Sequence, residues 1–264
     1  MPSTVHASPS TVPVTRVALV TGAGRRIGRA IAIGLAAAGW DVAVHYRASQ
    51  ADAEQTAAAI RALGRRAALL DCDLSDETAT RALVGRAIAA LGALDCVVNN
   101  ASQFEFDSAT DFSPALLARL TQANVAAPLL LAQALHAATP EDGQAVVINL
   151  LDQKLDNLNP DFLSYTLTKA ALKTATTMLA QALAPRVRVV GVSPGLTLVS
   201  GEQTDAGFAQ AHAATPLGHS SEPQDIVDAV CYLAGARAVT GTTLLVDGGQ
   251  HLMPLARDVM FLTK

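Results

Sequence analysis

Short runs of β-branched and aliphatic residues alternate with longer, Ala-rich stretches of helical period from Arg16 onward. This alternation is typical of repeated βαβ units, in which a buried strand is followed by an amphipathic helix. The apolar runs predict strands at 16–21, 41–46, 66–71, 94–99, 144–151, 187–193 and 242–247. The stretches between them predict helices near 26–38, 50–63, 76–91, 113–138, 161–184 and 223–234.

The predicted strands are apolar on both faces, as the runs at 17–20 and 146–148 show. Strands of this kind are buried on both sides in a parallel sheet that helices cover. Right-handed crossovers then predict a single doubly wound, Rossmann-type α/β domain with a parallel sheet of about seven strands flanked by helices. We expect this domain to span residues 16–249.

Three segments differ in composition from the βαβ pattern. Residues 1–15 hold three prolines among Ser, Thr and Val and lack the basic start and apolar run of a signal peptide, so they predict a mobile tail. The segment 195–221, rich in Gly, Ser, Thr and Gln, is long for a connection and is interpreted as a substrate lid. The tail at 250–264 carries apolar residues that suggest packing against a neighbouring subunit, namely Leu252, Met253, Val259, Met260 and Phe261.

Composition narrows the class of protein. Half of the 264 residues are apolar and 16% are charged, so the chain can bury a large core. The net charge of −4 argues against a nucleic-acid binder and favours a small-molecule ligand. Three widely spaced cysteines favour reduced thiols in a cytoplasmic protein, and six scattered histidines predict no metal site. The longest apolar stretch, 30–40, is far shorter than the roughly 18 to 20 residues that cross a bilayer, so no membrane span is expected.

Glycines follow the first predicted strand, at the edge where open parallel sheets bind ligands. Gly22, Gly24 and Gly28 lie in a segment that opens directly into a helix. Gly22 and Gly28 let the backbone turn tightly and let a pyrophosphate approach the N–H groups of the helix N-terminus. The spacing is G-x-G-x-x-x-G rather than the dinucleotide fingerprint G-x-G-x-x-G, so a nucleotide site and a plain strand-to-helix turn both stay open.

The end of the second strand indicates which nicotinamide cofactor such a site would take. An NAD site presents an acidic residue there to the ribose 2′-OH, whereas this chain has Tyr46 and Arg47. Arg47 and Arg25 suit a 2′-phosphate and favour NADP(H), the alternative being two solvated surface arginines. Asp73, just after the third strand, either accepts from the adenine amino group or caps the next helix.

Tyr165 and Lys169 are four residues apart at the start of a predicted helix, which places them on one face. A Lys ammonium beside a phenol favours the phenolate, so Tyr165 is expected to give or take a proton near neutral pH. The pair is informative because the chain has only three tyrosines. Together with the glycine loop it points to an enzyme that binds a nucleotide.

These features occur in an order that resembles a short-chain dehydrogenase/reductase from about residue 14 to residue 249. The segments that carry the resemblance are Thr21-Gly22, Asn99-Asn100-Ala101, Asn124, Tyr165-Thr166-Leu167-Thr168-Lys169, Ser193-Pro194-Gly195 and Val246-Asp247-Gly248-Gly249. The resemblance implies a reductase, usually a homotetramer, in which Tyr165 is the acid, Lys169 holds the nicotinamide ribose and Asn124 supports a proton-relay water. It implies NADPH as cofactor, with contacts from Gly22, Arg25, Arg26, Ile27, Gly28, Tyr46, Arg47, Asp73, Leu74, Asn100, Ala101, Ser102, Lys169, Pro194 and Gly195.

Two departures from the common family pattern are informative. Arg26 replaces the usual third glycine of the loop, and Asp152, thirteen residues before Tyr165, stands where the catalytic serine is expected. Ser164 points about 100° away from Tyr165 around the helix and is a poor substitute. Both departures resemble the pteridine reductase branch, which includes the dihydromonapterin reductases. That resemblance implies that Arg26 reaches toward the pterin and the coenzyme phosphates, and that Phe104 stacks the pterin against the nicotinamide.

The chemistry favours the same interpretation. A carboxylate would repel the oxyanion that forms when hydride adds to a ketone, whereas a protonated carboxyl can assist protonation of a ring nitrogen. The sequence therefore predicts an NADPH-dependent reductase that converts a dihydropteridine to a tetrahydropteridine, with Arg26, Phe104, Asp152 and Tyr165 at the substrate. For two of these residues a purely structural role stays open: Phe104 is a core aromatic, and Asp152 is a loop carboxylate or helix cap. The rival functions are a reductase of carbonyl or 3-oxoacyl-thioester substrates and a non-catalytic NADP(H)-binding regulator.

Overall fold

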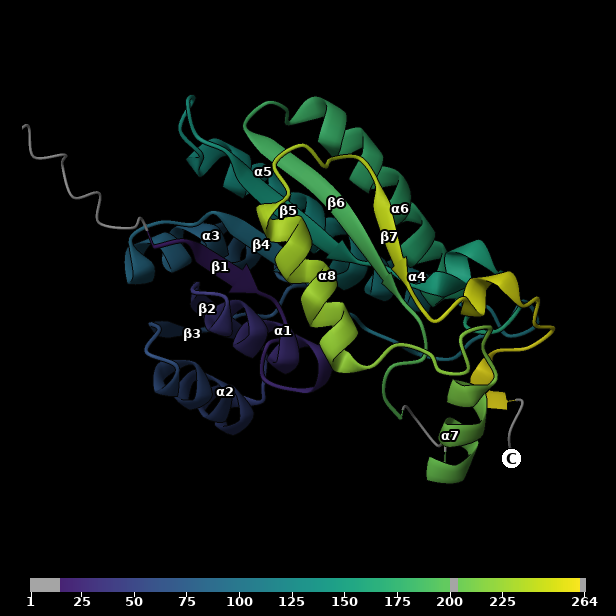
Figure 1. Cartoon of the computed structure of the whole chain (residues 1–264). Coiled ribbons are helices and arrows are strands. Elements are labelled where there is room, and N and C mark those ends of the chain that lie inside the picture. The colour runs from purple at the N-terminus through teal and green to yellow at the C-terminus, as the bar shows by residue number, and fades with distance from the viewer. Residues whose placement is uncertain (1–14, 200–203, 262–264) are drawn as a thin grey trace, which may run out of the picture.

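The computed structural model describes residues 15–199 and 204–261, and Figure 1 shows its layers. The predicted tail at 1–15 lies almost wholly outside the described residues. Seven parallel strands form one sheet in the order β3-β2-β1-β4-β5-β6-β7. The strands are β1 (Val17–Val20), β2 (Asp41–Tyr46), β3 (Ala67–Asp71), β4 (Cys96–Asn99), β5 (Ala145–Leu150), β6 (Val187–Pro194) and β7 (Thr243–Val246).

Helices cover both faces of the sheet, as Figure 1 shows. One face packs against α1 (Arg26–Ala37), α2 (Gln50–Ala62) and α8 (Pro223–Gly235). The other face packs against α3 (Glu77–Leu91), α5 (Ala127–Ala138) and α6 (Leu163–Ala182). The predicted doubly wound, Rossmann-type fold is therefore confirmed. The strand order reverses between β1 and β4, and this is where such sheets bind their ligands.

The predicted helix 113–138 is one helical run in three parts: α4 (Pro114–Thr121), the π-helix η1 (Gln122–Ala126) and α5. Pro128 lacks an N–H, so it cannot give the carbonyl of Asn124 the usual α-helical hydrogen bond. By length and composition, with a mean hydropathy of 1.3, this run could also cross a membrane, which inspection of the sequence overlooked. Leu131 and Leu135 on it are fully buried in the apolar layer against the sheet, as expected of a core helix.

The segments outside the βαβ units carry more structure than the sequence predicted. The predicted lid 195–221 contains α7 (Asp205–Ala213), whose first turn is capped by Thr204, while residues 200–203 are outside the described part of the chain. The C-terminal tail forms the short 3-10 helices η3 (Gln250–Leu252) and η4 (Val259–Phe261). The packing of the tail against a neighbouring subunit stays a prediction. Met260 and Phe261 pack on an aromatic cluster of their own chain, because that cluster offers apolar surface close by.

Candidate active site

Two cavities lie at the carboxyl ends of the strands and share part of their lining. The first, of about 550 Å³, lies over the glycine loop and the ends of β2, β3 and β4. The second, of about 310 Å³, lies over β5 and β6. Predicted residues that line the first are Gly22, Arg25, Arg26, Ile27, Gly28, Tyr46, Arg47, Asp73, Leu74, Asn100, Ala101 and Ser102. Predicted residues that line the second are Arg26, Ile27, Asn100, Ser102, Phe104, Asp152, Tyr165, Lys169, Pro194 and Gly195.

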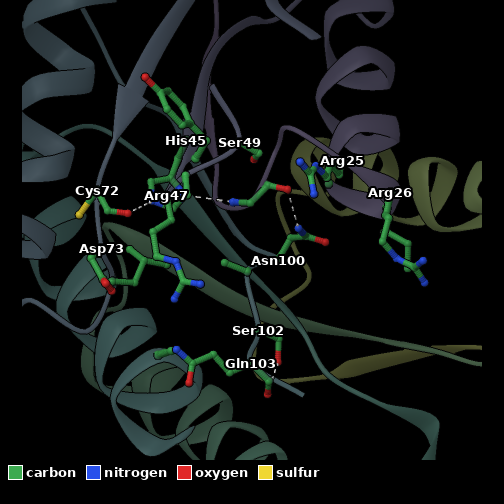
Figure 2. Close-up of a pocket in the computed structure, with 18 residues that line it drawn as sticks. Arg25, Arg26, His45, Arg47, Ser49, Cys72, Asp73, Asn100, Ser102 and Gln103 are labelled. Atoms are coloured by element: carbon green, nitrogen blue, oxygen red, sulfur yellow. Dashed lines mark hydrogen bonds between the residues drawn. The ribbon is translucent and has the colours of Figure 1, made fainter. Parts of the chain in front are cut away.

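The glycine loop forms one wall of the first cavity (Figure 2). Gly22 has a φ of 64°, a left-handed conformation that favours glycine. A Cβ at Gly28 would lie 2.2 Å from the carbonyl oxygen of Gly22, so no larger residue fits there. The Thr21 hydroxyl accepts from the backbone N–H groups of Asn100 and Ala101, each at 3.0 Å, and ties the loop to β4. Among the described residues, the N-cap residue of α1, Arg25, makes no side-chain cap hydrogen bond, so this helix N-terminus can receive an anion.

Sequence reasoning missed His45, whose buried ring is hydrogen-bonded to the backbone of the glycine loop. Its ring is 2% exposed, and its Nδ1 accepts from the backbone N–H of Gly22 at 3.0 Å. A backbone N–H can only donate, so Nε2 carries the proton and donates to the carbonyl of Cys72 at 3.1 Å. Burial lowers the pKa of His45 to about 4, which keeps the ring neutral. A histidine in an apolar strand beside the glycine loop is the only sequence signal of this role.

Arg47 and Asp73 lie together on one side of the first cavity, and Arg26 points to the opposite side (Figure 2). Within residues 15–199 and 204–261, Arg47 makes no hydrogen bond or ion pair, so its guanidinium is free to receive a phosphate. Arg25 is instead paired with Asp52, which a phosphate would have to displace. Arg26 donates to the carbonyl of Val199 at 2.8 Å and so reaches the lid.

The interpretation of Asp73 as a helix cap is wrong, since Asp76 caps α3. Asp73 accepts from the backbone N–H of Ser75 at 2.9 Å and from its hydroxyl at 2.7 Å. These two hydrogen bonds hold the pKa of Asp73 below its ordinary value. The ionised carboxylate can therefore only accept hydrogen bonds, as a contact with an adenine amino group requires.

The second cavity holds a hydrogen-bonded tyrosine–carboxyl pair. The Tyr165 hydroxyl donates to Oδ2 of Asp152 at 2.9 Å. The other carboxyl oxygen, Oδ1, accepts from the backbone N–H of Lys154 at 2.9 Å and caps the 3-10 helix η2 (Gln153–Asp156). Asp152 is thus both the helix cap and the partner of Tyr165. The ammonium of Lys169 donates to the carbonyl of Leu150 at 2.7 Å and lies 5.7 Å from the centre of the Tyr165 ring.

The pKa of Tyr165 differs from the expectation that Lys169 would favour its phenolate form. Burial, together with the charge of Asp152, raises the pKa of Tyr165 well above its ordinary value. Burial also raises the pKa of Asp152 and lowers that of Lys169 to about 8. The expected shift of Tyr165 toward the phenolate is therefore wrong, because Lys169 bonds a carbonyl rather than the phenol and Asp152 opposes the negative charge. Tyr165 keeps its proton at neutral pH, as a general acid must.

Phe104 is a wall of the second cavity rather than a core aromatic. Its side chain is 42% exposed. Its ring stacks on Phe162 with the centres 4.2 Å apart and stands edge-on to Tyr165 at 4.7 Å. An exposed flat ring beside the Tyr165 ring can stack on a planar substrate.

Asn124 joins the loop after β4 to α6. Its side-chain oxygen accepts from the backbone N–H of Gln103 at 2.8 Å and from the Ser102 hydroxyl at 3.2 Å. Its amide donates to the carbonyl of Gln103 at 2.9 Å and to the Thr168 hydroxyl at 3.1 Å. Four protein contacts occupy the side chain, so a relay water could reach Asn124 only at its main-chain carbonyl. Ser164, in contrast, is buried and donates to Asp107, away from the cavity.

Comparison with known proteins identifies the family. A family model described as Enoyl-(Acyl carrier protein) reductase matches residues 22–251, and a short chain dehydrogenase/reductase of Aspergillus aculeatus is 31% identical over 251 residues. The chain belongs to the short-chain dehydrogenase/reductase family.

The chain is similar to both solved structures and curated relatives. It is similar to FolM alternative dihydrofolate reductase 1 of Brucella canis, crystallised with NADP, at 39% identity and a TM-score of 0.87 over 92% of this chain and 96% of that one. An uncharacterised oxidoreductase of Methylorubrum extorquens is 39% identical over 89% of this chain and 97% of its own length. The 3-oxoacyl-[acyl-carrier-protein] reductase FabG of Staphylococcus aureus is 31% identical over 90% of this chain and 99% of its own length.

Proposed function

We propose that this protein is an NADPH-dependent reductase that converts a pterin-like dihydropteridine to the tetrahydropteridine. The first cavity fits the phosphates of that cofactor, because an uncapped helix N-terminus and the free guanidinium of Arg47 lie in its wall. Gly22, Gly28, Arg47, Asp73 and Lys169 are the residues that would hold it. When bound, the cofactor supplies a hydride. The related FolM structures from two Brucella species were both crystallised with NADP, which supports this choice.

The hydrogen bond between Tyr165 and Asp152 carries the proposal. Reduction of a ring C=N bond needs a hydride at carbon and a proton at the neighbouring nitrogen. Tyr165 holds a proton at neutral pH and can deliver it to that nitrogen, while Asp152, whose pKa is raised by burial, can return a proton to the phenol. The carbonyl of Asn124, free of its usual helical donor, is the group that would hold a relay water on the way to solvent.

The shape of the second cavity supports a flat substrate. Phe104 presents an exposed ring beside Tyr165, and Arg26 lines both cavities. We infer that Phe104 and Arg26 hold the pterin between the lid and the nicotinamide. With a ketone, hydride addition leaves a negative charge on the carbonyl oxygen. The carboxylate of Asp152 would oppose that charge, which disfavours ketone substrates.

Reduction of a 3-oxoacyl thioester is the second candidate, because the matching family model and the FabG relative are named for acyl-carrier-protein substrates. A non-catalytic NADP(H)-binding role has no such support, since Tyr165 and Lys169 are both present in the second cavity.

The proposal includes a cytoplasmic homotetramer. Exposed apolar residues on α6, Leu167 and Met178, would be covered in such an assembly.

The test is NADPH oxidation by the purified protein on a panel of substrates. The panel contains dihydrobiopterin, dihydromonapterin and dihydrofolate beside simple ketones and a 3-oxoacyl thioester. The proposal predicts a kcat/KM for at least one dihydropteridine that exceeds those for the carbonyl substrates by about tenfold or more. Turnover of the ketones or the thioester without turnover of any dihydropteridine would overturn it.

A further inference from the structure

The segment Arg257–Phe261, called here the C-terminal strap, forms part of the wall of the second cavity. Asp258, Val259 and Met260 of the strap line that cavity together with Tyr165 and Asp152. The 3-10 helix η4 at its end lies next to α7 of the lid, and the start of the lid, Gly195–Leu198, lines the same cavity. The cavity is thus bounded by two segments that lie outside the parallel sheet.

Ionic and apolar contacts both fix the strap to its own chain. The Arg257 guanidinium donates to the two carboxylate oxygens of Asp161 at 3.0 and 2.8 Å. The backbone N–H of Asp258 donates to the same carboxylate at 2.7 Å. Met260 and Phe261 pack on the cluster of Leu120, Phe162 and Tyr165. Met260 thus packs on the cluster that contains Tyr165 and lines the same cavity as that tyrosine.

A buried lysine connects the strap to the catalytic carboxyl. The side chain of Lys154 is only 4% exposed, and its ammonium pairs with Oδ2 of Asp258 at 3.2 Å. The backbone N–H of the same residue donates to Asp152. A buried ammonium without a counter-charge is strongly unfavourable, so the ion pair with Asp258 stabilises Lys154 beside Asp152, together with a hydrogen bond from the ammonium to the carbonyl of Asp161.

We propose that the C-terminal strap determines substrate specificity in the cavity of its own chain, and that Asp258 is a positioning residue for the Asp152–Tyr165 pair. The choice of a dihydropteridine as the test substrate rests on the proposed function. The charged and titratable groups that face Asp152 are Tyr165 and Lys169 of α6, Lys154 of η2 and Asp258 of the strap. Burial is the main cause of the raised pKa values of Asp152 and Tyr165, and the carboxylate of Asp258 raises both further.

Specificity is tested with variants at the apolar end of the strap. We compare Met260→Ala, the conservative Met260→Leu, a chain that ends at Ala256 and a control chain that ends at Phe261. Met260→Ala and the chain ending at Ala256 should raise the KM for the best substrate of the panel by about tenfold and reduce its kcat/KM advantage over a bulkier substrate. Met260→Leu and the control chain should stay within about twofold of the parent. The NADPH dissociation constant should be unchanged in all four, because the strap does not line the first cavity.

An unchanged KM and an unchanged substrate ratio in Met260→Ala would overturn the specificity claim, even if the chain ending at Ala256 does not fold.

The positioning claim is tested with Asp258→Asn, and Asp156→Asn is its matched control. Asp156 lies in η2 and pairs with Lys173, but does not line either cavity.

Removal of the Asp258 charge lowers the pKa of Asp152 and Tyr165, so the high-pH fall of kcat should move to lower pH. Asp156→Asn should leave the profile in place. Superimposable profiles for Asp258→Asn and the parent would overturn the positioning claim. If the parent reduces a ketone and no dihydropteridine, the proposed function fails, and the same variants are then scored on that ketone.

Discussion

The buried ring of His45 makes the stability of this protein depend on pH in a way that one substitution can isolate. In His45→Asn, the amide oxygen takes the place of Nδ1 and can still accept from the backbone N–H of Gly22, while the side chain no longer titrates. The contact to the Cys72 carbonyl is lost, so the variant is expected to be less stable than the parent at every pH. The informative quantity is the difference between the two proteins as the pH is lowered.

The magnitude follows from the pKa of His45, which is about 4 in the folded chain against an ordinary value of 6.5. The folded state binds fewer protons than the unfolded state between these two values, so the stabilising contribution of neutral His45 is complete above pH 6.5 and is lost as the pH falls toward 4. At pH 5 this linkage removes about 2 kcal/mol from the free energy of unfolding, relative to pH 8, and about 3 kcal/mol by pH 4.

Urea unfolding of both proteins at pH 8, 6.5 and 5 measures this quantity. Carboxylates titrate in both proteins, so their contribution cancels in the difference. The parent should lose about 2 kcal/mol more than His45→Asn between pH 8 and pH 5. Parallel pH dependence would show that His45 is not held neutral in the folded state, and the assignment of its hydrogen bonds to Gly22 and Cys72 would be refuted.

Two further substitutions test the walls of the two cavities. Arg47→Ala should weaken NADPH binding by roughly ten- to a hundredfold, because a charged phosphate contact is worth about 1.5 to 3 kcal/mol, and should leave NADH binding unchanged in a fluorescence titration. Equal affinities of the parent for NADH and NADPH would contradict it. Phe104→Ala should raise the KM for a dihydropteridine with little change in the NADPH dissociation constant or the Tm, because the ring is 42% exposed. A large fall in Tm with unchanged kinetics would show that the ring is part of the core, where its truncation costs about 3 to 5 kcal/mol.

The fold could be predicted because its signals are local. Strands such as Val17–Val20 and Ala145–Leu150 are apolar on both faces since helices cover both sides, and all their residues are buried. Most predicted helices begin and end within two residues of the observed ones. Helix α7 was missed because its turns mix small and polar residues without a clear apolar face, in a segment whose composition is typical of loops.

The candidate site was predictable only in part. Tyr165 and Lys169 share a helix face, and the glycine loop follows a strand, so both were visible in the sequence. The partners of these residues are set by tertiary contacts, which the sequence does not display. Lys169 bonds the carbonyl of Leu150, and Lys154 pairs with Asp258 across 104 positions of the chain.

The central claim, that Asp152 and Tyr165 deliver a proton to a pterin nitrogen, is tested most directly by the turnover of Asp152→Asn. This variant keeps the shape of the side chain and removes the carboxyl proton, and NADPH binding is checked separately to show that the first cavity is intact. We measure kcat for the parent, Asp152→Asn and Asp152→Ser on a dihydropteridine and on a simple ketone across a range of pH. The account predicts a fall of about 10² to 10⁴ in dihydropteridine turnover for Asp152→Asn, with parent turnover falling as the pH rises through the raised pKa of the Asp152 carboxyl. Dihydropteridine turnover by Asp152→Asn equal to that of the parent would reduce Asp152 to a helix cap and contradict the account.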